Sequence, residues 1–479
     1  MNRLLHDVAI IDTRGDPASV DIRSVAFDSR QVVAGALFCC VPGALSDGHD
    51  FAAQAVSAGA SALLCEHFLD LDLDVVQARL AAGGVRPAMA RAAAAIEGHP
   101  SRSLTTVGVT GTNGKTTVTH LVRAVLDAAG VPAGVIGTLD GERTTPEAPV
   151  LQHRLAELRD GGYRAVAMEV SSHALTQHRV DGVDFDVAAF TNLSHDHLDH
   201  HRTMEEYFAA KAELFRPERT RVAVVNADDP WGRRLLELLG STSGVTPVPV
   251  GRHEASDVRL RVGSTSFRWR GREVTVPLTG SFNVDNALVA ASVATALGVG
   301  EDDVARGLTA AGPVLGRMEV VDAGQPFAVL VDFAHTPAGL EVVLGSARRL
   351  AAGGRVVCVF GCGGDRDPTK RPEMGEVVGR LADVAVVTSD NPRSEDPGAI
   401  IAEVLAGISG TAEVVVEPDR FAAVGRAVAA AGPGDVVVVA GKGHESTQTS
   451  RAGTVPFDDR LVARQVLAGL GYDGAGTAP

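Results

Sequence analysis

A glycine-rich loop followed by lysine and threonine is the segment of this chain best equipped for chemistry. It reads Thr110-Gly-Thr-Asn-Gly-Lys-Thr-Thr117, follows an apolar run and leads into a helix-forming run. Glycines let backbone N–H groups close around phosphates, and the helix N-terminus adds its positive dipole end. Lys115 would reach the β- and γ-phosphates, and the Thr116 hydroxyl would bind Mg²⁺. The segment predicts a nucleotide triphosphate site. Thr110 stands where the common pattern has glycine, so a tight turn without a ligand is the alternative.

A second segment with chemical potential is the histidine-rich run His195-Asp-His-Leu-Asp-His-His201. Its spacing is typical of dinuclear metal sites in metallo-β-lactamase-type hydrolases. That reading needs further ligands on the strands of a β-sandwich, whereas the later histidines lie in α/β surroundings. It also leaves the phosphate loop without a role. We therefore favour another function, and we expect His195, His200 and His201 to be solvated loop residues.

Polar clusters also follow the apolar runs that we expect to be strands. In open α/β sheets, ligands bind outside the carboxyl ends of the strands. Six clusters obey this rule, and they predict a site assembled from several strand ends; they occupy residues 169–173, 192–201, 332–335, 361–366, 390–393 and 441–445.

The elements that carry these clusters divide the 479 residues into three expected units, 1–102, 103–317 and 318–479. Apolar strands alternating with helices predict α/β units with parallel sheets covered on both faces. Residues 257–278 alternate polar and apolar side chains, which favours a small antiparallel addition to the middle unit. Strands are expected at 24–27, 36–41, 62–66, 134–137, 165–170, 187–190, 222–225, 328–332, 356–360, 384–387, 413–416 and 436–440.

Composition narrows the class of protein. A net charge of −15 argues against a nucleic-acid partner. Five cysteines, an odd number without a repeated pair spacing, indicate a reducing compartment. The N-terminus does not read as a secretory signal, and no apolar run approaches the roughly 18–20 residues that span a bilayer. We expect a cytoplasmic protein without membrane insertion.

Taken together, the motifs resemble those of the Mur ligase family over nearly the whole chain. The matching segments are 111–117, Met168-Glu-Val-Ser-Ser-His173, 191–201 with Lys211, and the runs at 28–30, 47–49, 332–337, 361–366, 441–445 and 456–460. The resemblance implies a three-domain α/β Mur ligase fold. Its parts would be an N-terminal UDP-substrate-binding domain, a central P-loop-type ATP-binding domain with a parallel sheet, and a C-terminal Rossmann-like domain that brings the amino acid.

The sequence Asp390-Asn-Pro-Arg393 is the sharpest marker within the family. It is similar to that of Mur ligases that add meso-diaminopimelate to the D-glutamate γ-carboxylate of UDP-N-acetylmuramoyl-L-alanyl-D-glutamate, through an acyl phosphate, in peptidoglycan synthesis. Lysine-adding relatives lack the arginine. A guanidinium can grip the distal carboxylate of diaminopimelate and would repel a bare ammonium. The diaminopimelate residues implied are Arg366, Asp390, Asn391, Pro392, Arg393, Gly441 and Glu445. A plain surface arginine is the alternative for Arg393.

The resemblance also implies roles around ATP. Lys115, Glu169, His197 and Lys211 would be catalytic. Mg²⁺ would bind at two sites through Thr116, Glu169, His197 and Lys211, the lysine after carbamylation by CO₂; a solvated helix lysine is its alternative. Asn283 and Asn286 could instead cap a helix, and Phe333 replaces the usual tyrosine. His173 and His178 are expected to be core or surface residues. The ATP residues implied are Gly111, Thr112, Asn113, Gly114, Lys115, Thr116, Thr117, Asn283, Asn286, Arg317, Asp332 and His335.

For the UDP-N-acetylmuramoyl dipeptide, the implied residues are Phe27, Ser29, Thr144, Thr145, Ser171, Gln177 and Arg179. Arg179 suits a carboxylate or diphosphate, whereas Thr144 and Thr145 could form the edge of a hairpin instead. Three rivals stay open. A folylpolyglutamate synthetase-like or lysine-adding ligase would not explain the arginine of the 390–393 motif. A non-catalytic nucleotide-binding regulator should have lost Lys115, Glu169 or Lys211.

Overall fold

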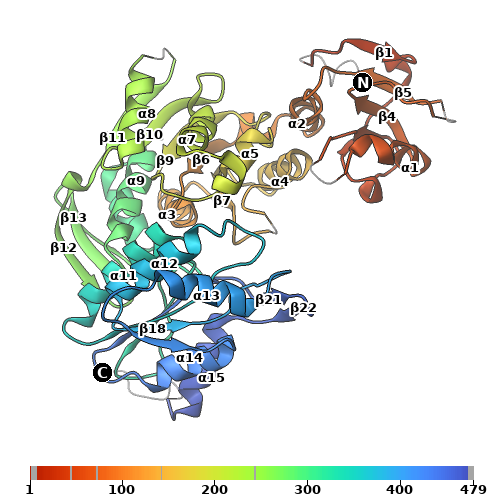
Figure 1. Cartoon of the computed structure of the whole chain (residues 1–479). Coiled ribbons are helices and arrows are strands. Elements are labelled where there is room, and N and C mark those ends of the chain that lie inside the picture. Colours follow the sequence, from red (N-terminus) through yellow and green to blue (C-terminus); the bar gives the residue numbers. More distant parts are fainter. Residues whose placement is uncertain (2–7, 44–45, 72–73, 142, 242–243, 473–479) are drawn as a thin grey trace.

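Three α/β units follow one another along the chain in the computed structural model (Figure 1). The structure describes residues 1, 8–43, 46–71, 74–141, 143–241 and 244–472. The first unit meets the second through the helices α2 (Val85–Ile96) and α4 (Ala148–Asp160), and the third unit lies below the second in this view. The expected domain limits at 102/103 and 317/318 stay predictions.

The first unit is built on a five-stranded sheet in the order β1-β5-β4-β3-β2, with β1 antiparallel to its neighbour and the other pairs parallel. The expected strands at 24–27, 36–41 and 62–66 are found with shifted ends. Strands β1 and β5 were not predicted. The three residues of β1 are all exposed and carry no apolar pattern. The elements are β1 Asp12–Arg14, β2 Ser24–Ala26, β3 Ala36–Cys39, α1 Ala52–Ser57, β4 Ala60–Cys65, β5 Val76–Arg79 and α2 Val85–Ile96.

The second unit contains a six-stranded, fully parallel sheet in the order β11-β10-β9-β6-β8-β7. Its strands and helices are β6 Thr105–Thr110, α3 Lys115–Ala128, β7 Ala133–Ile136, α4 Ala148–Asp160, β8 Ala165–Glu169, α5 Ser172–Thr176, β9 Phe185–Phe190, α6 Leu198–His201, α7 Met204–Ala212, β10 Thr220–Asn226, α8 Pro230–Gly240, β11 Thr246–Val250, α9 Phe282–Ala296 and α10 Glu301–Thr309. Strand β6 lies between β8 and β9. The loop that leaves β6 is therefore flanked by the ends of both neighbours.

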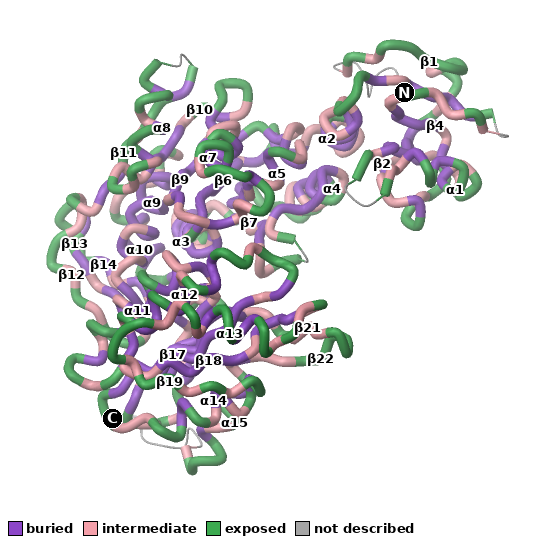
Figure 2. The backbone as a smooth tube through the Cα atoms, viewed as in Figure 1, coloured by how far each residue is buried: buried purple, intermediate pink, exposed green. Residues whose placement is uncertain are grey.

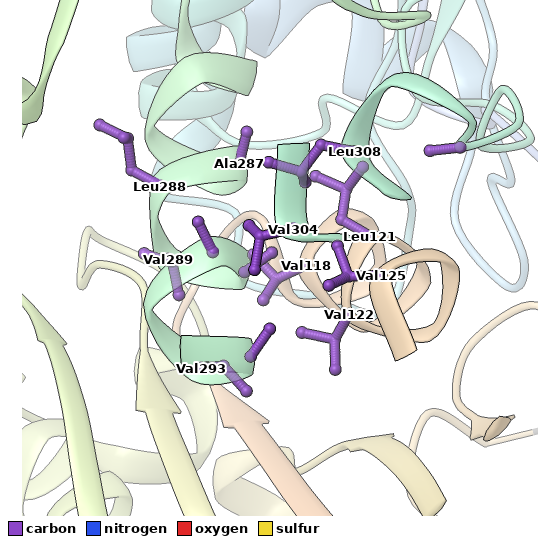
Figure 3. Packing of buried hydrophobic residues seen from close by; sticks show 14 of the residues in the cluster. Val118, Leu121, Val122, Val125, Ala287, Leu288, Val289, Val293, Val304 and Leu308 are labelled. Atoms are coloured by element: carbon purple, nitrogen blue, oxygen red, sulfur yellow. The ribbon is translucent and has the colours of Figure 1, made fainter. Parts of the chain in front are cut away.

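The expected antiparallel addition is a three-stranded sheet, β12 Ala255–Arg261, β13 Ser264–Trp269 and β14 Arg272–Val276. Its buried face, which includes Phe267 and Trp269, belongs to the same core as helices α3, α9 and α10. Figure 3 shows valine and leucine side chains of the three helices meeting in this core, among them Val118, Val289 and Val304. Each such buried side chain contributes about 1.5–3 kcal/mol of hydrophobic stabilisation.

The third unit has a mixed sheet in the order β15-β16-β20-β17-β18-β19, antiparallel only at β15. All five strands expected here have the predicted limits, because each is a short, mainly apolar run; β16 ends in Asp332 and β19 begins with Glu413. Figure 2 shows this sheet as a buried layer between helices. The elements are β15 Glu319–Val320, β16 Ala328–Asp332, α11 Pro337–Ala351, β17 Val356–Phe360, α12 Lys370–Leu381, β18 Val384–Val387, α13 Pro397–Gly407, β19 Glu413–Val416, α14 Arg420–Ala429, β20 Val436–Ala440, β21 Thr447–Ser450, β22 Gly453–Pro456 and α15 Asp459–Gly469.

Polar contacts join the units. Between the first and second, the Arg86 guanidinium lies 3.3 Å from Glu147. Between the second and third, Arg349 donates to the Ser281 hydroxyl. Within the part of the chain that the structure describes, no helix is long and apolar enough to cross a membrane.

The contact between α10 and α3 yields a test of the central core. A Cβ added at Gly307 would lie 2.5 Å from the Val125 Cα, so Gly307→Ala should destabilise the protein by about 1–3 kcal/mol despite alanine's better helix propensity. Gly345→Ala in α11 is the matched control. Its added Cβ meets nothing within 4 Å, and it should be neutral or stabilising by up to about 1 kcal/mol. Urea unfolding measures both, and equal effects would contradict the packing argument.

Candidate active site

The glycine-rich loop lies between the end of β9 and the start of α9. Gly111 has φ 148°, and a Cβ there would lie 1.9 Å from the Thr191 hydroxyl. Gly114 has φ 88°, and its added Cβ would lie 2.4 Å from Asn286 Oδ1. Both positions combine a left-handed backbone with a close neighbour, so only glycine fits. The loop is therefore a tight, backbone-lined turn at the N-terminus of α3, as a phosphate site requires.

Lys115, the first residue of α3, turns back over this loop. Its Nζ donates to the carbonyls of Gly111 and Thr112, both at 2.9 Å. Burial lowers the pKa of Lys115, while the nearby Glu169 and Asp196 carboxylates act in the opposite sense. The lysine that the sequence assigned to the phosphates thus lies directly over the phosphate loop.

The Glu169 carboxylate, at the end of β8, connects this loop to its neighbours. Its Oε1 accepts the Thr116 hydroxyl at 3.0 Å and the Thr138 N–H at 2.8 Å. A Cβ at Gly137 would lie 2.4 Å from the same oxygen, so the approach needs glycine. The register Val109↔Glu169 between β6 and β8 sets this geometry. A buried hydroxyl and carboxylate in contact are oxygen ligands of the kind that hard cations prefer.

Arg317 is the cationic neighbour of this pair. Its Nη2 donates to the Thr116 hydroxyl at 3.0 Å, and its guanidinium lies 4.6 Å over the Phe333 ring. Phe333 replaces the tyrosine usual in the resembling family, and it retains the flat ring on which the guanidinium stacks. An arginine from the segment that enters the third unit therefore contacts the phosphate loop of the second.

Lys211, in α7, is buried beside the same loop. Its Nζ donates to the Gly111 carbonyl at 2.9 Å and lies 4.7 Å over the Tyr207 ring. The residue is 1% exposed, and burial lowers the pKa of its amine well below the ordinary value. The alternative of a solvated helix lysine is therefore wrong.

The histidine-rich run does not behave as one unit. His201 is buried and shares a 2.8 Å hydrogen bond with the Ser172 hydroxyl, so its expected solvation is wrong. His195 is half-buried, with Asp367 at 3.5 Å and Glu373 at 3.3 Å, both from the third unit. His200 is exposed, as expected, but it lies in helix α6 and not in a loop. Burial lowers the pKa of His197 to about 3.

His173, for which the sequence indicated no role, stacks on His200 at 4.2 Å and meets His197 edge-on at 4.9 Å. Three histidines of the run thus pack around His173, whereas His195 contacts the third unit. Among the residues that the structure describes, no three His, Cys, Asp or Glu side chains are grouped to hold a metal ion. This arrangement does not support the dinuclear metallohydrolase reading.

The residues assigned to the UDP substrate by resemblance lie in two places. Thr145 donates to the Glu169 carbonyl at 2.9 Å and accepts from the Ser171 N–H at 3.0 Å. Arg179 donates to the Thr145 carbonyl at 2.9 Å and to Gln177 Oε1 at 2.6 Å. Thr144, bonded to Thr138 at 3.0 Å, lies with Thr145 in the loop before α4, so the hairpin alternative is wrong.

Phe27 and Ser29 belong to the first unit, and the structure does not bring them into contact with the group around Thr145. Ser29 is buried, and its hydroxyl donates to Gln54 Oε1 at 3.0 Å. The two residues directly follow β2, at the edge of the first sheet. Any ligand that touches both groups would have to extend from the first unit to the second.

In the third unit, the run Asp390-Asn-Pro-Arg393 leaves β18 and lies against the end of β20. Asn391 Nδ2 donates to Glu445 Oε2 at 2.8 Å. Arg393 has φ 51°, its Nη1 donates to the Gly364 carbonyl at 2.6 Å, and it is half-buried. A Cβ at Gly441 would lie 2.6 Å from Asp390 Oδ2. These residues lie at the ends of β18 and β20, whereas Arg366 is exposed and forms no hydrogen bond or ion pair within the described residues.

Asp332, His335, Asn283 and Asn286 complete the assigned set. Both Asp332 carboxylate oxygens accept backbone N–H groups, from Met318 and Ala334, at 2.7 Å each. His335 bonds the Phe333 carbonyl at 2.8 Å. Ser281 occupies the N-cap position of α9, so the helix-capping alternative for the two asparagines is wrong. Asn286 instead lies against Gly114.

Comparison with known proteins explains this arrangement. Three family models match, the Mur ligase family catalytic domain over residues 21–105, the Mur ligase middle domain over 109–294 and the Mur ligase glutamate ligase domain over 316–443. A UDP-N-acetylmuramoyl-L-alanyl-D-glutamate–2,6-diaminopimelate ligase from Syntrophomonas wolfei is 42% identical, with 96% of this chain and 97% of the relative covered. The chain belongs to the Mur ligase family.

Other relatives agree with this assignment. The enzyme of the same name from Geobacillus kaustophilus is 45% identical to this Mur ligase and covers 93% of it, with 95% of the relative aligned. A solved structure of a protein with that name is 28% identical, with a TM-score of 0.65, and the match covers 98% of this chain and 99% of the other. The three-domain α/β fold expected from the sequence is therefore confirmed.

One charged cluster in this Mur ligase escaped the sequence reasoning. Glu147 is buried between three arginines, with Arg179 at 2.9 Å, Arg143 at 3.1 Å and Arg86 at 3.3 Å. One carboxylate beside three guanidinium groups leaves local positive charge in an acidic protein. The only signal in the sequence was the four-residue spacing of Arg143 and Glu147, which is common on any helix.

The phosphate loop of this Mur ligase yields a test with an internal control. Gly114→Ala forces a Cβ against Asn286 and should lower the affinity for an ATP analogue at least 100-fold. Gly130→Ala, beyond the other end of α3, shares the positive φ (75°) but meets nothing within 4 Å. It should cost stability without changing nucleotide affinity. Isothermal titration measures both; unchanged binding in Gly114→Ala would contradict the loop assignment.

Proposed function

We propose that this Mur ligase is an ATP-dependent ligase that joins meso-diaminopimelate to the D-glutamate γ-carboxylate of UDP-N-acetylmuramoyl-L-alanyl-D-glutamate. The reaction serves peptidoglycan synthesis and forms ADP and phosphate. The names of the two relatives quoted above support the substrate pair. The loop Asp390-Asn-Pro-Arg393 and Glu445 carry the choice of amino acid in this proposal, because the loop supplies a guanidinium and contacts the Glu445 carboxylate through Asn391.

Amide formation needs an activated carboxylate, because oxide is not a leaving group. Phosphoryl transfer from ATP to the γ-carboxylate forms an acyl phosphate. The free amine of diaminopimelate then attacks the carbonyl carbon, and phosphate leaves from the tetrahedral intermediate. Such catalysis consists of charge neutralisation and alignment. Lys115 and the N–H groups of the glycine-rich loop hold the phosphates. The contact between Thr145 and Glu169 keeps the loop before α4 next to them.

Mg²⁺ fits the residues at the phosphate loop. The Thr116 hydroxyl and the Glu169 carboxylate are hard oxygen ligands already 3.0 Å apart. His197 and a carbamylated Lys211 would hold a second ion together with Glu169. When bound, the ions neutralise charge on the phosphates. Arg317 donates to the same Thr116 hydroxyl, so it has to release that oxygen when a cation binds there.

Carbamylation of Lys211 is supported by the surroundings of its amine. The Nζ is buried, has a carbonyl and an aromatic face as neighbours, and forms no ion pair within the described residues. Reaction with CO₂ converts an amine into an anion, and it removes the cost of burying an unpaired ammonium.

Lys211 therefore provides a second test. Protein equilibrated with ¹³C-bicarbonate should show one carbamate carbon signal by NMR, which Lys211→Arg lacks. Lys211→Arg should also lose at least 100-fold in kcat, because arginine keeps the positive charge and cannot become an anion. Lys370→Arg, at another buried lysine, controls for the substitution and should retain the signal. A carbamate signal that survives in Lys211→Arg would contradict the assignment.

The amino-acid specificity is tested by phosphate release with ATP, Mg²⁺ and the UDP-muramoyl dipeptide. Release should depend on meso-diaminopimelate and should be at least 100-fold less efficient with L-lysine. Arg393→Ala should raise the KM for diaminopimelate about 10- to 100-fold and leave the KM for ATP unchanged, since a bidentate charge-assisted contact is lost. Arg426→Ala removes an exposed arginine that pairs with Glu417 and is the matched control.

Two outcomes would count against this proposal. Comparable efficiency with L-lysine would keep the ligase and remove the role of Arg393. Equal loss of affinity for ATP and diaminopimelate in Arg393→Ala would mean that the arginine supports the fold. We also propose a cytoplasmic location, which agrees with five cysteines that are all free and buried.

A further inference from the structure

Lys442 is a fully buried lysine at the centre of the proposed diaminopimelate site, and the reaction described above gives it no task. It follows Gly441, directly after β20. Its side chain is 0% exposed, and its Nζ lies 3.1 Å from Asn391 Oδ1 and 3.3 Å from Glu445 Oε2. A buried ammonium needs a paired anion, and Glu445 is the carboxylate within ion-pair distance among the described residues.

This contact divides the Glu445 carboxylate into an inner and an outer oxygen. The inner Oε2 accepts from both Lys442 and Asn391. The outer Oε1 has no hydrogen-bond donor within the described part of the chain, and the side chain is 35% exposed. Oε1 is therefore the oxygen that remains available to accept from a ligand amine, while Lys442 contacts Oε2.

Asn391 is held in a fixed orientation by the same group. Its Oδ1 accepts from Lys442 Nζ at 3.1 Å and from the Thr449 N–H in β21 at 3.0 Å. Both lone pairs of that oxygen are then in use. The orientation of the Asn391 amide is therefore fixed by Lys442 and by the β21–β22 hairpin.

We infer that Lys442 is a specificity-determining residue that disfavours amino acids ending in a bare amine. The inference rests on the proposed function. Only the Glu445 carboxylate would separate a ligand ammonium at Oε1 from the Lys442 ammonium. Like charges at such short range repel strongly in a poorly solvated site. L-Lysine brings only that ammonium. The distal end of meso-diaminopimelate adds a carboxylate on the same carbon, which offsets the repulsion and meets Arg393.

The other charged residues near Glu445 do not cancel the repulsion between Lys442 and a ligand ammonium. Arg420 and Asp459 form a completely buried pair, with Nε–Oδ1 at 2.8 Å and Nη2–Oδ2 at 2.7 Å, and so offset each other. The Asp390 carboxylate lies against Gly441, near the Arg420 guanidinium. Lys442 is the cation in direct contact with the carboxylate that would receive the amine.

Lys442→Met tests this inference, because methionine is similarly long and uncharged. The measured quantity is the ratio of kcat/KM for meso-diaminopimelate to kcat/KM for L-lysine. Both values come from one protein preparation, so a loss of folded protein cancels. The ratio should fall about tenfold or more relative to the unmodified chain. Gln448→Ala is the matched control: it removes the 2.7 Å bond from Gln448 Nε2 to the Asp390 carbonyl and changes no charge, so it should leave the ratio unchanged.

Equilibrium dialysis with labelled meso-diaminopimelate and L-lysine measures the same discrimination as a ratio of Kd values and needs no turnover. An unchanged ratio in Lys442→Met, with both substrates weakened equally, would overturn the inference and reduce Lys442 to a support of the loop. A similar fall in Gln448→Ala would also overturn it. Selective binding of diaminopimelate without phosphate release by the unmodified chain would instead overturn the proposed reaction.

Discussion

The buried carboxylate of Glu169 is the contact on which the arrangement of this Mur ligase depends. Its side chain binds the Thr116 hydroxyl, and its main-chain carbonyl accepts from Thr145. One residue at the end of β8 thus joins the glycine-rich loop to the loop before α4, which carries Thr145. Neighbouring parallel strands end at the same edge of the sheet, so this junction follows from the strand order β9-β6-β8. The Glu169 carboxylate lies so close to Gly137 that a Cβ at this position would collide with it.

The second half of the site belongs to a different unit, and one short segment joins the two halves. Arg317 binds Thr116, and Asp332 anchors the next residue, Met318, through its backbone N–H. His195 adds contacts to Asp367 and Glu373 across the same boundary. A nucleotide at the phosphate loop would therefore act on the residues that link the units. Closure of such units excludes water, which would otherwise hydrolyse an acyl phosphate.

Local charge in this protein differs from its net charge. The chain is acidic overall, at −15. Three arginines nevertheless surround Glu147 at the joint of the first two units, and Lys442 lies behind Glu445 in the third. At Glu147 one carboxylate contacts three guanidinium groups, so an excess of positive charge remains at that joint. Local positive charge of this kind can attract an anionic ligand even though the net charge of the chain is negative.

Much of the architecture was readable in the sequence, because it depends on neighbours along the chain. The five apolar strands of the third unit, the glycine loop and the 390–393 motif are local patterns with a direct physical meaning. The burial of His201, the stacking of Arg317 on Phe333 and the pairing of Lys442 with Asn391 were not readable. Arg317 meets Thr116 across 201 residues, and Lys442 meets Asn391 across 51. Such contacts depend on which strand ends adjoin in space, and only the tertiary structure decides that.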